Sequence, residues 1–132
     1  MKITADTNLL VRALTGDHPT QSAAARAELA HAELIALPTP ALCELVWVLA
    51  RGYKIATPDI ADAIRRLIAA ANVAANRPAV AAGLAHLEAG GDFADGVIAH
   101  EGRWLGADVF VSFDRDAVAR AQAAGQPACV PA

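Results

Sequence analysis

The chain has 132 residues and a formal net charge of −3, and 55% of its residues are hydrophobic. A chain of this length typically buries roughly two thirds of the surface that its unfolded form exposes, so residues 1–132 can form one domain without disulfides. The mild acidity excludes a broad basic surface for non-specific nucleic-acid binding, but it permits a local basic rim. With only two cysteines and no uncharged segment of spanning length, we expect a cytoplasmic protein with no membrane segment.

The first half of the chain alternates short apolar segments with segments of helical spacing. Asp6 ends the first apolar segment, and the helical spacing begins directly after it. Further along, Thr39 and Pro40 open a helix and Gly52 ends it, each where a helix end prefers that residue type. The pattern predicts strands at residues 2–6 and 34–37 and helices at residues 7–14, 21–33, 39–52 and 57–71.

The second half continues this alternation. Residues 109–114, VFVSFD, are aromatic and β-branched and give the clearest strand signal, whereas Gly83 weakens a predicted helix. The pattern predicts strands at residues 72–75, 109–114 and 128–130 and helices at residues 77–91, 92–106 and 115–125. Short strands alternating with helices indicate an α/β fold with a mostly parallel sheet covered on both faces. Ligands of such sheets bind outside the carboxyl ends of the strands.

Four aspartates occupy positions where a strand ends or a helix begins. Asp6 and Asp114 stand at N-cap positions, and Asp92 with Asp95 resembles a capping box in which a short acid replaces glutamate. For each of the four taken singly, helix capping is therefore the simpler interpretation.

Glu44 does not fit this interpretation, because it lies in the middle of the helix predicted at residues 39–52. The stretch ALCELVWVLA is apolar all round, which indicates a buried helix, and Glu44 is its only charged residue. A buried ionised carboxylate is normally neutralised, paired or bound to metal. An ion pair with Arg51 or a position at an exposed edge of the helix would also account for it.

Convergence of Asp6, Asp95 and Asp114 on Glu44 at the carboxyl end of the sheet would require a bound cation. Each like-charged pair at about 4 Å repels by ~4 kcal/mol at an effective dielectric constant near 20. An all-oxygen ligand set selects a hard ion, Mg²⁺ or Mn²⁺, over zinc. The histidines show no metal-binding spacing and are expected at the surface or in helix caps: His18, His31, His86 and His100.

Four segments resemble, in order and spacing, the motifs of the PIN-domain nucleases, particularly the VapC-like toxins: ITADTNLLVRAL, LCELVWVLA, DFADGVIA and VFVSFDRDA. Together they span essentially the whole chain. The resemblance implies a three-layer α/β/α PIN-like fold with a short-stranded, mostly parallel central sheet. It also implies a ribonuclease that uses Mg²⁺ or Mn²⁺ to hydrolyse RNA phosphodiester bonds.

By this resemblance, Asp6, Glu44 and Asp95 correspond to the first, second and third acids of the family. Asp114 corresponds to the fourth acid, which is more variable. The resemblance implies that Asp6, Asp95 and Asp114 bind the metal and that Glu44 orients or deprotonates the attacking water. Gly96 stands in place of the alanine often found after the third acid, a change that lowers helix propensity and touches no ligand.

Several neighbours of these acids are candidates for supporting roles. Side chains that could position water or a carboxylate, or hold metal through water, are those of Thr7, Asn8, Asp92, Ser112 and Asp116. Ordinary turn and capping roles would explain the same residues. Candidates for binding RNA phosphates, with solvated helix surface as the alternative, are Arg12, Arg103 and Arg115. No aromatic residues interleave with the basic ones in the way that would suggest base stacking.

Other classes of protein fit less well. A receiver domain would require an acidic pair after the first strand and a late lysine, yet no lysine follows Lys54. A haloacid-dehalogenase-type phosphatase would require two aspartates one residue apart, and ADTN contains one. The remaining alternative is a catalytically inactive PIN-like module that binds RNA or protein. The VapC-like resemblance implies RNA as substrate, a homodimer, and an inhibitory VapB-like antitoxin whose tail blocks the metal groove.

Overall fold

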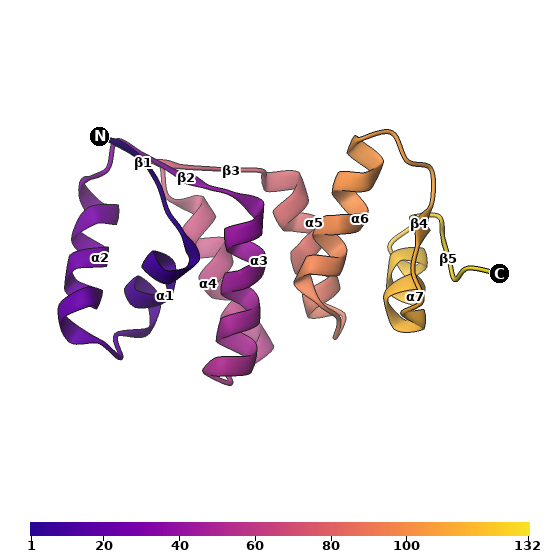
Figure 1. Ribbon diagram of the computed structural model, residues 1–132, viewed down its shortest axis with the longest axis horizontal. Coiled ribbons are helices and arrows are strands. Elements are labelled where there is room, and N and C mark those ends of the chain that lie inside the picture. Colours follow the sequence, from indigo (N-terminus) through magenta and orange to yellow (C-terminus); the bar gives the residue numbers. More distant parts are fainter. The chain divides into compact units, whose positions relative to one another are not determined.

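The computed structural model describes residues 1–132 and contains two compact units, Met1–Asn76 and Arg77–Ala132 (Figure 1). The N-terminal unit contains β1 (Lys2–Thr4), α1 (Thr7–Thr15), α2 (Pro19–His31), β2 (Leu34–Leu37), α3 (Thr39–Trp47), the π-helix η1 (Val48–Gly52), α4 (Thr57–Ala69) and β3 (Val73–Ala75). The C-terminal unit contains α5 (Arg77–Glu88), α6 (Phe93–Trp104), β4 (Phe110–Val111), α7 (Arg115–Ala123) and β5 (Ala128–Cys129). Seven α-helices alternating with short parallel strands confirm the predicted α/β class.

The strands of the N-terminal unit form a parallel sheet in the order β1-β2-β3. Ile35 of β2 is the central residue of the register, paired with Ile3 of β1 and with Val73 of β3. Parallel neighbours require crossover connections, which α1 and α2 supply between the first two strands and α3, η1 and α4 between the next two. Because β1 and β2 run the same way, Asp6 and the start of α3 follow the strands at the same edge of this sheet.

The core of the N-terminal unit is built from the inner faces of its helices. The side chains that are almost fully buried there include those of Leu10, Leu42, Leu45, Ile60 and Ile64. Two of them, Ile60 and Ile64, are four residues apart on α4, the spacing that puts side chains on one face of a helix. Burying such a side chain contributes about 1.5–3 kcal/mol, so these residues stabilise the packing of α1, α3 and α4 in this unit.

In the C-terminal unit, two glycines allow α5 and α6 to pack with their backbones close together. A Cβ atom at Gly96 would lie 2.4 Å from the carbonyl oxygen of Ala82, and one at Gly83 would lie 2.7 Å from the ring of Phe93. Phe93 is completely buried. Gly83 and Gly96 thus lower helix propensity but are required by the packing. The strands β4 and β5 of this unit pair in parallel, joined through α7.

Every predicted helix and strand is present, with differences at the ends. The strand predicted at residues 109–114 shortens to Phe110–Val111, because Ser112 and Asp114 instead form the turn and cap that begin α7. The helix predicted at residues 39–52 continues past Trp47 as a π-helix. Its N-cap is Pro38 and not Thr39, a shift of one residue that is common at helix ends.

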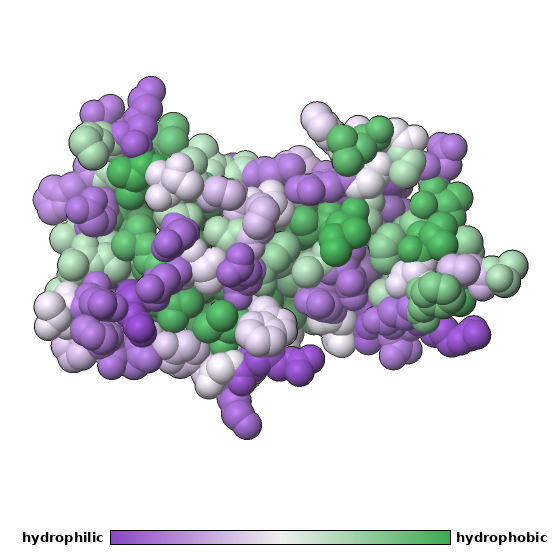
Figure 2. All heavy atoms as spheres, in the orientation of Figure 1, coloured by the Kyte–Doolittle hydropathy of each residue, from purple (hydrophilic) through white to green (hydrophobic).

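Large apolar side chains remain at the surface of both units. Figure 2 shows green apolar groups among the purple hydrophilic ones. The most exposed of the large apolar residues are Met1, Trp47, Ile98, Trp104, Leu105 and Phe113. Cys43 and Cys129 form no disulfide. None of the helices has the length and apolar character that crossing a membrane requires.

Candidate functional site

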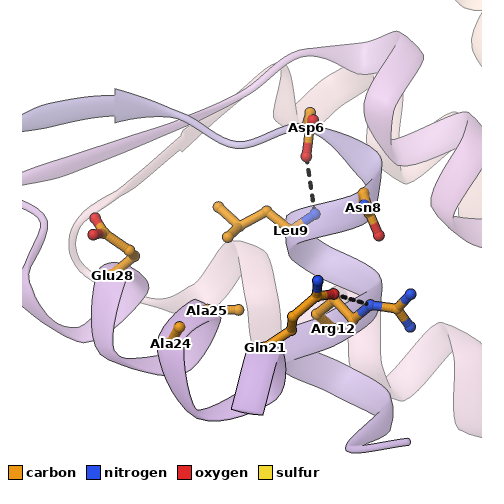
Figure 3. A pocket seen from close by; sticks show the side chains of 8 residues that line it. All are labelled: Asp6, Asn8, Leu9, Arg12, Gln21, Ala24, Ala25 and Glu28. Atoms are coloured by element: carbon orange, nitrogen blue, oxygen red, sulfur yellow. Dashed lines mark hydrogen bonds between the residues drawn. The ribbon is translucent and has the colours of Figure 1, made fainter. Parts of the chain in front are cut away.

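Asp6 caps the first helix and lines a cavity of the N-terminal unit. Its Oδ1 accepts a hydrogen bond from the backbone N–H of Leu9 at 2.9 Å, as an N-cap residue does. The cavity, of about 330 Å³, is also lined by Asn8, Arg12 and Glu28 (Figure 3). The capping interpretation of Asp6 is therefore confirmed. Since the cap uses only Oδ1, Oδ2 remains available to a ligand.

Glu44 lies on α3 and is exposed, so the expectation of an all-round buried helix is wrong. The exposure of Trp47, which is 60%, shows that α3 has a solvent-facing side. A charged residue at this position of an apolar helix is therefore explained by its place on the exposed side of α3. Near the same edge of the sheet, the hydroxyl of Thr7 donates to the carbonyl oxygen of Ala41 at 3.5 Å and joins the start of α1 to that of α3.

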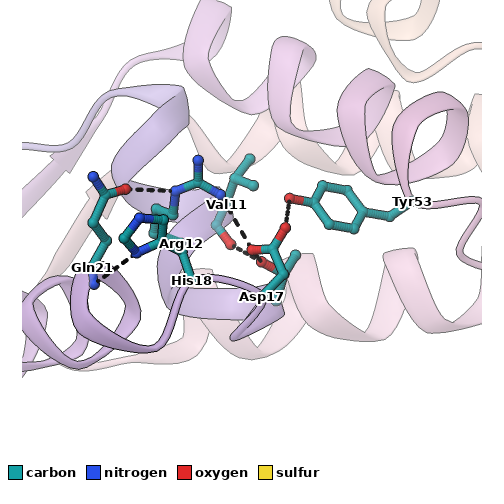
Figure 4. A network of polar contacts seen from close by, with 7 residues as sticks. Val11, Arg12, Asp17, His18, Gln21 and Tyr53 are labelled. Carbon is teal, nitrogen blue, oxygen red and sulfur yellow. Dashed lines mark hydrogen bonds and ion pairs between the residues drawn. The ribbon is translucent and has the colours of Figure 1, made fainter.

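Arg12 is engaged by its own unit. Its Nε donates to Oε1 of Gln21 at 2.8 Å, and its Nη1 lies 3.2 Å from Oδ1 of Asp17 (Figure 4). The hydroxyl of Tyr53 donates to Oδ2 of the same Asp17 at 2.6 Å. Two nitrogens of the Arg12 guanidinium are thus committed to this network, and its charge is paired with that of Asp17.

The network predicts a titration effect at Asp17. The pKa of this carboxyl is lowered, first by the hydrogen bond from Tyr53, then by that from Thr15, and less by Arg12. A lowered pKa in the folded state gives stability that is present above the unfolded-state pKa and is lost as the pH falls through the folded-state pKa. We expect Tyr53→Phe to raise the pKa of Asp17, measured by NMR titration of its carboxyl carbon. An unchanged midpoint would show that the tyrosine hydroxyl is not the main cause.

The start of α6 carries two acids with different roles. Asp92 is the N-cap, and its Oδ1 accepts from the backbone N–H of Ala94 at 3.2 Å. Asp95 lies in the first turn and is half-buried. No hydrogen bond or ion pair to the Asp95 carboxylate is present, so the predicted capping box is only half realised.

Asp95 is the electrostatically unfavourable acid of the C-terminal unit. Burial raises the pKa of its carboxyl, and the negative charges of Asp92 and Asp114 raise it further. The positive charge of Arg120 and the imidazole of His86 lower the pKa by smaller amounts. A half-buried carboxylate with two acidic neighbours and no donor is a position that a cation would stabilise.

The unfavourable environment of the Asp95 charge predicts that Asp95→Asn changes the stability of the metal-free protein. Because the folded-state pKa is raised, ionised Asp95 destabilises the fold at neutral pH, and the penalty disappears below the ordinary aspartate pKa of about 4. We expect the variant to be more stable at pH 7, by less than about 1 kcal/mol since solvent screens a half-buried group. Thermal unfolding in EDTA across this pH range measures the difference. A difference that stays constant or widens as the pH falls would contradict the prediction.

Asp114 is the N-cap of α7. Its Oδ1 accepts from the backbone N–H groups of Asp116 and Ala117 at 3.0 and 3.1 Å. The backbone N–H of Asp114 in turn donates to Oγ of Ser112 at 3.0 Å, which fixes the turn before the helix. Asp116 and Arg115 are exposed in the first turn of α7. Ser112 thus has the ordinary turn role that was one of its two predicted roles, because its hydroxyl contacts the backbone of Asp114 and not the carboxylate.

His86 contradicts the expectation that all four histidines lie at the surface or in caps. His18 does cap α2, but His86 is only 5% exposed, and its Nδ1 has no hydrogen-bond partner. Burial lowers the pKa of this imidazole, while the nearby charge of Asp95 raises it by less. The sequence did contain a signal, since His86 falls on the same helical face as the buried Ala79 and Gly83.

Arg120 is a second residue that sequence reasoning missed. Its side chain lies against Gly91, where an added Cβ atom would come within 2.6 Å of the Arg120 Cδ. Arg120 thus reaches from α7 to the loop before α6 and contributes positive charge at Asp95. Its spacing within α7 carries no sequence signal for this role.

The acids are distributed over both units, with Asp6 and Glu44 in the first and Asp92, Asp95 and Asp114 in the second. Within neither unit do three or more His, Cys, Asp or Glu side chains gather closely enough to hold a metal ion on their own. The donors around Asp95 are carboxylate oxygens, which suit a hard divalent cation.

Comparison with known proteins agrees with this chemistry at the level of the family. The profile of the PIN domain matches residues 3–123 and so includes elements of both units. No curated protein matches the chain. Proteins with this domain are generally nucleases that act on nucleic acid, usually with divalent metal ions. With a match over most of its length, and acids in the predicted order, the chain belongs to the PIN-domain family.

Proposed function

We propose that the chain is an Mg²⁺- or Mn²⁺-dependent endoribonuclease and the toxin of a toxin–antitoxin pair. The observation that carries the nuclease proposal is the environment of Asp95. Its carboxylate is half-buried, has no donor, and has its pKa raised by burial and by Asp92 and Asp114. Such an arrangement costs stability without a cation and becomes favourable with one, which is typical of a site kept for function.

In this proposal, Asp6 and Asp95 hold the principal cation through their free carboxylate oxygens. A bound divalent ion lowers the pKa of water and offsets the charge that builds on the phosphate during in-line attack. Glu44, exposed on α3, orients the attacking water and accepts its proton. Asp114 has one oxygen committed to its helix cap and offers the other to the water or to a second ion.

The supporting residues follow from the contacts that they make. Thr7 and Ser112 hold the turns beside Asp6 and Asp114 through hydrogen bonds. Asn8 lines the same cavity as Asp6, and Asp92 and Asp116 add negative charge near their helix caps. Of the three candidate arginines, the exposed Arg103 and Arg115 are better placed than Arg12 to bind phosphates, because Arg12 is already engaged.

A toxin of this kind is expected to have two protein partners, a second copy of itself and an antitoxin. We propose that the whole chain is one PIN domain that acts as a cytoplasmic homodimer, inhibited by a VapB-like antitoxin. Exposed apolar side chains are available for such contacts, among them Trp47 at 60% and Phe113 at 82% exposure.

Cleavage of total RNA tests the proposal. The purified chain, freed of any co-purifying protein, would be incubated with total RNA in Mg²⁺, in Mn²⁺ and in EDTA, and the ends of the fragments would be sequenced. We expect cuts in either metal and none in EDTA, with a 5′-phosphate on the downstream fragment. No cutting in any metal would favour the alternative, a catalytically inactive PIN-like module that binds RNA or protein.

A further inference from the structure

The C-terminal unit contains a cavity of about 530 Å³ beside α5 and α6. Its walls include small residues that create room, among them Ala82, Ala85 and Gly96. The close backbone contact at Gly96 keeps the two helices at a fixed separation. The volume falls within the range of roughly 300–1,000 Å³ that is typical of small-molecule sites.

The polar lining of this cavity is basic or neutral. Arg103, His86, His100 and Gln126 line it, and no carboxylate does. This is unusual in a chain whose 14 acidic residues outnumber its 11 lysines and arginines. The negative charges of Asp95 and Asp92 also act on His86. Within the lining itself, the exposed guanidinium of Arg103 offers a planar pair of donors to a ligand that carries negative charge.

An aromatic surface lies directly beside this positive charge. Trp104 follows Arg103 in the last turn of α6, lines the same cavity and is 81% exposed. An indole exposed to this extent offers a face on which a nucleobase can stack, a contact that tolerates any base. The pairing of an aromatic group with a basic one, which the sequence did not suggest, is thus present at one cavity.

One further group in the cavity has unused hydrogen-bonding capacity. Gln126 donates from Nε2 to the carbonyl oxygen of Ala99 at 3.0 Å, which leaves its Oε1 free. A ligand with a hydrogen-bond donor on a planar edge would satisfy this oxygen. His86 also lines the cavity, but its unpartnered Nδ1 is itself buried, so we assign no ligand contact to that atom.

We propose that this cavity binds one nucleotide, with its base stacked on Trp104 and its phosphate held by Arg103. Gln126 then contacts the polar edge of the base through its free Oε1. The nucleotide is either free or part of a single-stranded RNA, and the second source rests on the ribonuclease function proposed above.

Tryptophan fluorescence tests this site in the full chain. Trp47→Phe leaves Trp104 as the sole tryptophan, since the sequence has two. AMP, GMP, CMP, UMP and a single-stranded RNA hexamer would be titrated in EDTA, which prevents cleavage. We expect quenching of Trp104, and at least about tenfold weaker binding when Arg103→Gln is added. Arg66→Gln is the matched control, because Arg66 is exposed and pairs with Asp62 in the other unit.

The outcomes separate the two sources of the nucleotide. Quenching by mononucleotides supports a site for a free nucleotide, and quenching by the hexamer alone supports a site for RNA. No quenching by any of these probes, or equal quenching in Arg103→Gln, would overturn the proposal. Binding is measured in EDTA, so it does not depend on the cation that cleavage requires. A negative nuclease assay would therefore not contradict the proposed nucleotide site. Likewise, an absence of nucleotide binding would not contradict the proposed nuclease.

Discussion

Asp95→Asn lowers the rate of RNA cleavage by about 100-fold or more, if this carboxylate binds the catalytic cation. An amide has nearly the same shape but no charge, so the substitution removes a metal ligand and keeps the helix start. Loss of one preorganised charge-stabilising group commonly costs 10²–10³ in rate. Single-turnover cleavage of a defined RNA in Mg²⁺ measures the effect.

Asp92→Asn is the matched control for this measurement. Asp92 lies three residues earlier and caps α6 through a hydrogen bond to Ala94. Asparagine caps helices as well as aspartate does, so we expect this variant to retain activity within about tenfold. Equal losses in the two variants would mean that general negative charge, and not ligation by Asp95, supports cleavage.

Gly96→Ala is expected to destabilise the fold by about 1–3 kcal/mol, the usual cost of overpacking a core. The added Cβ would lie 2.4 Å from the carbonyl oxygen of Ala82 and 2.9 Å from the Cα of Gly83, both backbone atoms. Neither can move without shifting α5. The clash outweighs the gain of up to about 1 kcal/mol that alanine brings to a helix interior. Denaturant unfolding monitored by circular dichroism measures the change.

Gly102→Ala on the same helix is the control. Apart from its chain neighbours and the nearby backbone of its own helix, no atom lies within 4 Å of the position that its Cβ would take, so the helix propensity of alanine acts alone. We expect this variant to be more stable by roughly 0.5–1 kcal/mol. If Gly96→Ala were also stabilising, the close approach of α5 and α6 would not exist in solution.

The sequence predicted the order of the elements well, because they have strong local signals. The glycine pair before Asp92 and the aspartates at helix starts mark boundaries that depend on nearby residues only. The three caps at Asp6, Asp92 and Asp114 were accordingly correct. Gly96 shows the limit of such reasoning, since its helix propensity is local but its contact with Ala82 comes from another helix.

The parts of the candidate site that were missed depend on tertiary packing. Glu44 was expected to be buried because its helix is apolar, but α3 exposes one side and Glu44 lies there. The burial of His86 had a signal in the helical face that it shares with Ala79 and Gly83, but the contact of Arg120 with Gly91 joins separate elements of the chain. A single sequence contains no information on such pairs except through a resemblance, and the PIN resemblance concerned the acids alone.

Binding of Mn²⁺ tests the central proposal most directly. After removal of metal with EDTA and dialysis, the chain would be titrated with Mn²⁺ while the electron paramagnetic resonance signal of the free ion is recorded. The proposal predicts saturable binding that both Asp6→Asn and Asp95→Asn weaken, and that Asp92→Asn leaves nearly unchanged. Binding that neither Asp6→Asn nor Asp95→Asn alters would contradict a metal-dependent site built on these two carboxylates.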